Sequence, residues 1–373
     1  MPGQILILGG GPAGTATALA LRKHAPDLAV TVVESSAYER IRIGETLPPQ
    51  VQTLLTHLGV WPAFLARRYR PAFGTTAAWG SGDLHTNQFF FNVHNRGWHL
   101  DRRDFDALLA TQARTHGVVM RTQTRMVDHE QQADGRWRVT LRHAEGHCVD
   151  EMADFVVDAT GRLAAFARLQ GAKKVAYDQL VGAFRFFDVD ASYTDSATLV
   201  EANSAGWWYS SLLPNDQLVV ACMSDADIMG QHQLKRGKEW MAMAQETHHT
   251  QQRLTRVCNN GRDAAPSIYA AHTQQLDQFV GDGWLAAGDA ATTFDPLSSQ
   301  GIFKALRAGI FAAYAVSDHV NGDSQALASY ETFVNREFAA YRETWQDYYD
   351  QERRWPASPF WQRRHRHEIA AAQ

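Results

Sequence analysis

Residues 9–14 have the types and the spacing needed to bind a pyrophosphate. They read Gly-Gly-Gly-Pro-Ala-Gly, so that Gly9, Gly11 and Gly14 form a G-x-G-x-x-G pattern with Pro12 and Ala13 inside it. The first glycine of such a pattern allows a tight turn, the second admits a pyrophosphate close to the backbone, and the third lets a helix pack against a strand. The N–H groups of the following helix then face the phosphates. The pattern predicts a dinucleotide site.

The neighbouring elements support this prediction. An apolar strand, 5–8, precedes the glycines, and a helical pattern through Ala16 and Leu21 follows them. A second apolar strand, 30–33, ends in Glu34, which is twenty residues past Gly14 and at the usual place of a ribose-hydroxyl acceptor. The alternative is a glycine-rich turn of an α/β protein that binds nothing.

The composition limits the class of protein. The 373 residues suffice for about two domains, and 45 % apolar with 20 % charged residues is typical of a globular protein. A net charge of −4 gives no attraction to nucleic acid or to a membrane. The three cysteines are far apart and form no CxxC, which argues against disulfides or a zinc site and favours the reducing cytoplasm. The apolar run at the N-terminus is too short for a signal peptide or a membrane span, so we expect neither.

Further along the chain, several stretches have readable patterns. The charged, proline-containing segment 38–49 is either a functional loop or a solvated connector. Strands are predicted at 73–79 and 87–93, and a β-rich region between about 175 and 223. Residues 235–258 and 324–352 are predicted to be helical. The tail 353–373 contains a basic cluster of Arg363, Arg364 and Arg366. It is predicted to be solvated or partly disordered, and docking of a partner is the alternative.

Two later segments give the chain a family resemblance. Asp158-Ala159-Thr160-Gly161 is similar to the Ala-Thr-Gly stretch of FAD-linked oxidoreductases, and Gly288-Asp289 followed by 295–301 (Asp-Pro-Leu-Ser-Ser-Gln-Gly) resembles their Gly-Asp motif. With the first glycines, the chain resembles the glutathione-reductase-type FAD proteins of the aromatic-monooxygenase kind, which include halogenases and geranylgeranyl reductases.

The resemblance implies a fold and a domain organisation. It implies an α/β protein with a Rossmann-like FAD-binding domain of the aromatic-hydroxylase type, an interleaved β-sheet substrate domain and C-terminal helices. The expected FAD-binding segments are 1–72, 101–172 and 265–325, the expected substrate domain is 73–100 with 173–264, and the expected C-terminal region is 326–373.

The resemblance also implies roles for individual residues. Asp289 is expected to bind the ribityl chain, and Pro296 to Gly301 to lie against the isoalloxazine, with Pro296 and Gly301 nearest the chemistry. Arg102 is similar to the family's cofactor-facing arginine, although a surface arginine at a helix start is the alternative. The remaining cofactor-binding residues implied are Glu45 of the Gly-Glu-x-x-x-Pro loop, Gly161, Gly288, Gln300 and Ile302.

Several departures from the family pattern indicate which group of the family the chain resembles most. Halogenases carry a lysine after a glycine-rich strand start, and residues 73–79 contain none. Their Trp-x-Trp-x-Ile-Pro motif is also absent, since 206–214 reads Gly-Trp-Trp-Tyr-Ser-Ser-Leu-Leu-Pro. No clear Asp-Gly motif for NAD(P)H is found, since Asp158-Ala159-Thr160-Gly161 stands in its place. The electron donor is therefore either a separate flavin reductase or NADPH used directly. The arrangement is similar to the flavoproteins that modify a tryptophan side chain during tryptophylquinone biogenesis.

These points give a functional hypothesis. The resemblance implies an FAD-dependent monooxygenase that hydroxylates an aromatic small molecule, or a tryptophan of a precursor polypeptide, through a flavin C4a-hydroperoxide. Strand alternation puts Trp207 and Tyr209 on one face, where they are candidate substrate-wall residues or ordinary sheet core. His85, His94 and His99 are candidate acids or bases, although structural roles are more common for histidine.

Three alternatives stay open at this stage. One is an FAD-dependent reductase or dehydrogenase of the geranylgeranyl-reductase type. The second is a flavin-dependent halogenase, which the missing lysine and tryptophan motif disfavour. The third is a flavin-binding chaperone with little chemistry of its own.

Overall fold

The computed structural model describes residues 3–89, 93–190, 192–258 and 264–365. A six-stranded sheet carries the N-terminal glycines at the end of its central strand. In spatial order its strands are β20 (Val280–Gly281), β21 (Trp284–Ala286), β12 (Phe155–Asp158), β1 (Gln4–Leu8), β2 (Ala29–Val33) and β8 (Val119–Arg121). All neighbours run parallel except β20 and β21. The buried residues Ile5 to Leu8 and Phe155 to Val157 are apolar because helices cover such parallel strands.

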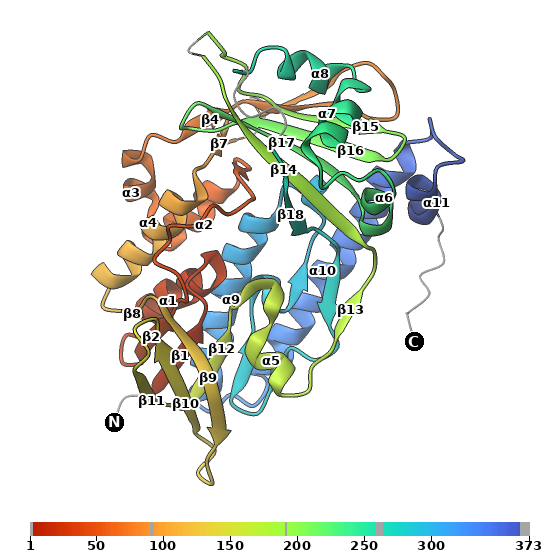
Figure 1. Cartoon of the computed structure of the whole chain (residues 1–373). Helices are drawn as coiled ribbons and strands as arrows, with labels where there is room; N and C mark the ends of the chain where they lie inside the picture. Colours follow the sequence, from red (N-terminus) through yellow and green to blue (C-terminus); the bar gives the residue numbers. More distant parts are fainter. Residues whose placement is uncertain (1–2, 90–92, 191, 259–263, 366–373) are drawn as a thin grey trace.

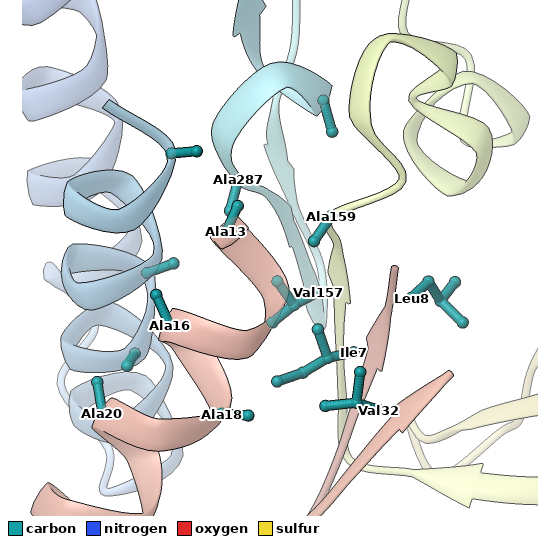
Figure 2. Packing of buried hydrophobic residues seen from close by; sticks show 14 of the residues in the cluster. Ile7, Leu8, Ala13, Ala16, Ala18, Ala20, Val32, Val157, Ala159 and Ala287 are labelled. Carbon is teal, nitrogen blue, oxygen red and sulfur yellow. The ribbon is translucent and has the colours of Figure 1, made fainter. Parts of the chain in front are cut away.

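Two helices pack together on this sheet. They are α1 (Pro12–His24) and α9 (Gly301–Val320), and α1 presents Ala13, Ala16 and Ala20 toward its partner (Figure 2). Gly309 lies at their contact, where an added Cβ would come within 2.4 Å of the Ala13 carbonyl oxygen. Small side chains therefore let the two backbones approach closely, which brings the start of α9 near the glycine-rich turn.

A second, seven-stranded sheet lies at the other end of the molecule (Figure 1). Its order is β18 (Ser267–Ala270), β14 (Leu180–Asp188), β17 (Gln217–Asp225), β16 (Gly206–Leu212), β15 (Thr198–Asn203), β5 (Gly74–Ala78) and β6 (His85–Gln88). Segments from two distant parts of the chain thus share one sheet. The strand expected at 87–93 is His85–Gln88 instead, so Phe89 lies beyond its end, and residues 90–92 lie outside the described residues.

Helices α6 (Ala226–Gln231), α7 (Gly237–Gln245) and α8 (His249–Leu254) cover one face of this sheet. The prediction of a single helix over 235–258 is wrong, because α7 ends at Gln245 and a separate helix, α8, begins at His249. The buried Glu201 carboxylate accepts hydrogen bonds from the N–H groups of His248, His249 and Thr250, which fixes a new helix start there.

Smaller elements complete the fold. The short sheets are β3 (Thr46–Leu47), β7 (Gly97–His99) and β4 (Arg70–Ala72); β11 (Cys148–Ala153), β10 (Trp137–His143) and β9 (Thr124–Gln131); and β13 (Lys174–Ala176), β19 (Gln274–Leu276) and β22 (Thr292–Thr293). The other helices and 3-10 turns before the C-terminal segment are α2 (Val51–His57), α3 (Trp61–Ala66), α4 (Arg102–Thr115), η2 (Gly161–Leu163), α5 (Ala165–Leu169), η3 (Gly288–Ala290) and η4 (Pro296–Ser298).

The C-terminal segment is part of the core. Helix α10 (Ala326–Gln351) runs along the first sheet's helices to the second sheet, where α11 (Pro359–His365) follows (Figure 1). Phe360 and Trp361 are fully buried, and the buried Arg364 guanidinium pairs with Asp225 at 2.8 Å. The expectation of a solvated tail is therefore wrong for Phe360, Trp361 and Arg364, which are buried against the second sheet, while Arg353 and Arg363 are exposed. Arg366 lies outside the described residues.

Candidate active site

The glycine-rich turn has the geometry that its sequence predicts. Gly9 has φ +108°, and an added Cβ would lie 2.1 Å from the Ala159 carbonyl oxygen. A Cβ on Gly14 would lie 1.9 Å from the Gly9 carbonyl oxygen. A Cβ on Gly11 would meet only Arg42, at 3.8 Å, so this backbone faces open space at the start of α1. The turn therefore fits the close approach of a pyrophosphate.

Glu34 reaches this turn. Its Oε2 accepts a hydrogen bond from the Gly10 N–H at 2.9 Å, and its Oε1 accepts from Ser36 and from Arg42. Tyr38 adds a second brace, because its hydroxyl donates to the Gly10 carbonyl oxygen at 2.9 Å. The carboxylate at the ribose position thus also holds the turn in place.

Arg102 holds the loop 38–49 in place by hydrogen bonds. Its Nη1 donates to the Ile43 carbonyl oxygen at 2.7 Å, and its Nε and Nη2 donate to the buried Asp106 carboxylate. Asp106 also accepts from Arg42 at 3.0 Å, so one carboxylate joins two arginines. Sequence reasoning did not find Arg42 or Asp106, although the spacing of four residues between Arg102 and Asp106 on one helix was a signal.

The other predicted motifs meet at the same place. The buried Asp158 carboxylate accepts from Thr160 and from the N–H groups of Phe166 and Ala167 at the start of α5, so it orients the turn before Gly161. Gly161 has φ +65° with open space around it, and Gly288 lies against Ala13, where a Cβ would come within 2.6 Å. Three motifs distant in sequence therefore converge on the start of α1.

Asp289 is paired with a lysine that sequence reasoning missed. Lys304, 1 % exposed, donates to Asp289 Oδ1 at 2.7 Å and also to the Thr292 carbonyl oxygen. Burial works to raise the pKa of Asp289, but the Lys304 ammonium and the Arg162 guanidinium outweigh it and hold the pKa below its usual value. The signal was a charged residue within the apolar run Ile302–Leu306.

The start of α9 is open. Pro296 is half-buried, Gln300 and Gly301 are exposed, and a Cβ on Gly301 would meet nothing within 4 Å. Ile302 is buried. The free N–H groups and positive dipole end of this 20-residue helix can therefore face an electron-rich ring.

A buried polar cluster joins the loop of Glu45 to the second sheet. The Thr46 hydroxyl lies 3.1 Å from the Tyr209 hydroxyl and 3.2 Å from His99 Nδ1, while His99 Nε2 lies 2.8 Å from the Ser196 carbonyl oxygen. Burial lowers the pKa of His99 to about 4, so the ring is neutral near pH 7. Burial also raises the pKa of the Tyr209 phenol, with the Glu45 charge adding to the effect.

Glu45 has an unsatisfied polar atom in this cluster. It is 3 % exposed, and its Oε1 has no hydrogen-bond partner among the described residues. Burial raises its pKa to about 7, against the opposing charge of Arg102. An unpaired buried carboxylate oxygen is costly, which makes this atom a natural acceptor for a donor group of a ligand.

The other candidates lie outside the polar cluster, although His94 lines the cavity described below. Trp207 is 1 % exposed, and its Nε1 donates to the Tyr349 hydroxyl at 3.0 Å. Such a buried side chain does not fit the expected role in the wall of a substrate site. Of the two candidate wall residues, only Tyr209 reaches the polar cluster. Trp208 packs on the opposite face against Trp240. His85 is exposed on β6, and His94 lies near Thr53 at the surface.

Two further features were not foreseen. A cavity of about 1000 Å³ opens between α3 and β5, and its lining includes Trp61, Phe73, Trp98 and Ser196. Ser196 thus borders the cavity and contacts His99. On the β10–β11 hairpin, His143, Glu145 and His147 place ligand atoms within 4.8 Å of one another.

Comparisons with known proteins agree with this geometry. The sequence model of the "FAD binding domain" family matches residues 3–339. The FAD-dependent oxidoreductase LodB of Marinomonas mediterranea is 31 % identical over 366 residues, which covers 96 % of each chain. The flavin-dependent halogenase CmlS superposes with TM-score 0.82 at 24 % identity, over 98 % of this chain and 68 % of that one. The peptidyl tryptophan dihydroxylase QhpG superposes with TM-score 0.79 at 25 % identity, over 98 % and 79 %.

The chain belongs to the FAD-binding-domain family, and it is an FAD-dependent oxidoreductase. The predicted α/β fold of the halogenase and hydroxylase type and the predicted cofactor, FAD, are confirmed. In the part of the chain that the structure describes, no helix has the length and apolar character needed to cross a membrane.

Proposed function

We propose that the protein is an FAD-dependent monooxygenase that hydroxylates the indole ring of a tryptophan in a precursor polypeptide. The similarity to the peptidyl tryptophan dihydroxylase QhpG, which extends over 98 % of this chain, carries the proposal. QhpG is essential for tryptophylquinone cofactor biogenesis. A precursor of a tryptophylquinone enzyme is therefore the first substrate to test.

The residues present fit FAD. The Gly9–Gly14 turn would hold the pyrophosphate, Glu34 and Asp289 would contact the ribose and the ribityl chain, and the start of α9 would face the flavin. When bound, FAD would supply the activation of oxygen, since protein side chains carry no such chemistry. The remaining tasks, to place the ring and to exclude water, belong to this chain.

The polar cluster provides the groups that would handle the substrate. The Tyr209 hydroxyl lies 3.1 Å from the Thr46 hydroxyl, which in turn lies 3.2 Å from Nδ1 of the neutral His99. These contacts fix the position of the Tyr209 hydroxyl. Glu45 Oε1 is the unpaired acceptor beside them. With a pKa of about 7, Glu45 could accept the ring proton that hydroxylation displaces.

The cavity beside this cluster suits a polypeptide substrate. Its volume of about 1000 Å³ is at the upper end of the range for ligand sites, well beyond the need of a single indole. Trp61, Trp98 and Phe73 give it an aromatic lining, and Ser196 connects it to His99. We therefore assign this cavity to the residues that flank the target tryptophan.

Halogenation is the second candidate, because CmlS, which superposes well, is a flavin-dependent halogenase. The chain has no lysine between residues 24 and 172, so β5 offers no ammonium at the place expected for the halogenase lysine. The lack of a clear NAD(P)H motif favours delivery of electrons by a separate flavin reductase.

The test supplies the FAD-loaded protein with NADH, a flavin reductase, oxygen and a tryptophan-containing precursor peptide, with and without bromide. Mass spectrometry should show oxygen added to the tryptophan peptide in both conditions. Tyr209→Phe should lower the yield roughly tenfold, while the exposed control His85→Gln should not. A brominated peptide would establish the halogenase instead, and substrate oxidation without added oxygen would identify a dehydrogenase.

A further inference from the structure

Three aromatic side chains on successive turns of α10 all reach Asp295. The Asp295 N–H donates to the Tyr341 hydroxyl oxygen at 2.7 Å. Trp345 Nε1 and the Tyr349 hydroxyl donate to Asp295 Oδ2, at 3.0 and 2.8 Å. A spacing of four residues puts these side chains on one stripe of the helix. We call Tyr341, Trp345 and Tyr349 the α10 ladder.

On its other side, Asp295 holds the loop before α9. Its Oδ1 accepts from the Leu297 N–H at 2.9 Å, and the Ser298 hydroxyl donates to its carbonyl oxygen at 3.0 Å. The residue is 1 % exposed. One buried carboxylate therefore connects the C-terminal end of the long helix α10 to the turn that contains Pro296.

Three side chains from other parts of the chain contact the ladder in turn. Trp207 of β16 donates to the Tyr349 hydroxyl at 3.0 Å, and the Thr273 hydroxyl lies 2.8 Å from that of Tyr341. The Arg364 guanidinium of α11 lies 5.1 Å from the centre of the Tyr349 ring. This gives Trp207 a role as support, which its burial already indicated.

We propose that Asp295 is a positioning residue, through which the α10 ladder fixes the Pro296–Gly301 loop against the flavin. The proposal rests on the proposed placement of this loop beside FAD. The family model ends at residue 339, so all three ladder residues lie beyond it. The C-terminal segment thereby supplies a constraint on the flavin that the matched domain does not contain.

The charge of Asp295 offers a way to observe this role. Burial raises its pKa to about 6, with the Asp178 carboxylate adding to the effect and the donors Leu297 N–H, Tyr349 and Trp345 opposing it. Tyr341 also faces the group, and Arg364 lies behind Tyr349. As the pH falls through about 6, the carboxylate gains a proton and becomes a weaker acceptor for Trp345 and Tyr349. The loop against the flavin should then relax.

The experiment follows the visible spectrum of the FAD-loaded full-length protein between pH 5 and 8, together with FAD affinity by fluorescence. The wild type should show a spectral transition with its midpoint near the pKa of Asp295. Asp295→Asn should abolish the transition near pH 6 and leave any that Glu45 gives near pH 7, and Tyr349→Phe should shift the first transition and weaken FAD binding roughly tenfold. Tyr348→Phe is the matched control, since that side chain is 46 % exposed on the same helix, and it should change neither.

If the spectra and their pH dependence stay the same in Asp295→Asn and Tyr349→Phe, the proposal is wrong. Should Asp295→Asn not fold, Tyr349→Phe still decides, because it removes one hydroxyl and leaves the carboxylate in place. These spectra need no substrate. A failure to hydroxylate the peptide would therefore reject the proposed function and leave this test intact.

Discussion

The two ends of the expected FAD site are held by different kinds of contact. At the glycine-rich end, Gly9 and Gly14 are needed because neighbouring backbone leaves no room for a Cβ, and the atoms concerned lie in adjoining turns and strands. At the α9 end, the loop is held by side chains about fifty residues away, through Asp295 and the α10 ladder. The first end thus depends mainly on backbone sterics, to which Glu34 and Tyr38 add hydrogen bonds to Gly10, and the second depends on hydrogen bonds from a distant helix.

This difference has a consequence for how each end should respond to mutation. A backbone clash cannot be relieved by small movements, so changes at the glycine-rich end should act in an all-or-none manner. A hydrogen bond contributes a modest free energy, so single changes at the α9 end should be graded. The following experiments test the contrast, from the largest expected effect to the smallest.

Gly14→Val should give the largest loss. Its Cβ would lie 1.9 Å from the Gly9 carbonyl oxygen and 3.2 Å from Ala159 Cβ. We expect purified protein without FAD, seen as the absence of flavin absorbance relative to protein absorbance. Gly11→Ala is the control, since its Cβ has room and the variant should fold, with FAD binding weakened only by crowding of the pyrophosphate. A normal flavin content in Gly14→Val would mean that the turn is not built as described.

Asp289→Ala should have the next largest effect, and it acts on stability as well as on binding. It leaves the buried Lys304 ammonium without its carboxylate. The loss in the free energy of unfolding should stay below the about 3–5 kcal/mol of a fully buried pair, because the Asp289 side chain is 39 % exposed and the Thr292 carbonyl oxygen still accepts from Lys304. Adding Lys304→Met should restore most of this stability but not FAD affinity. Denaturant unfolding and FAD titration of both variants separate the two effects. Equal stability of Asp289→Ala and wild type would show that the ion pair is not formed.

His99 should give a smaller, pH-dependent effect on stability. Its pKa is lowered from 6.5 to about 4 in the folded protein, so its contribution to stability is present above pH 6.5 and is lost as the pH falls toward 4. The loss should reach at most about 3 kcal/mol. Glu45 and Asp295 change in the opposite direction, because their raised pKa values favour the folded state at low pH.

Comparison of variants isolates the histidine from these carboxyl groups. His99→Gln should flatten the fall in unfolding free energy between pH 6.5 and 4 relative to the wild type. The exposed His85→Gln should keep the wild-type slope. Parallel curves for wild type and His99→Gln would show that His99 is not buried in its neutral form.

The amount of the site that could be predicted differs from residue to residue. Gly9, Gly14, Gly288 and Asp289 could be placed in one site because each belongs to a short segment with its own signature. Lys304 could not, although a lysine in an apolar helical run was visible, because its partner depends on how α9 packs. The prediction of a continuous helix at 235–258 was wrong, because the residue that caps the start of α8, Glu201, lies in β15, about fifty residues earlier in the chain.

The sequence by itself determined the cofactor class and the α/β fold. Glycine patterns impose backbone shapes within a few residues, and such shapes can be recognised without knowing the rest of the molecule. Only the tertiary structure decided that Tyr209 meets Thr46, that Trp207 supports Tyr349, and that Phe360 and Trp361 of the tail are core. Those contacts join residues far apart in the chain, and they depend on the packing of whole helices and sheets, which no local pattern encodes.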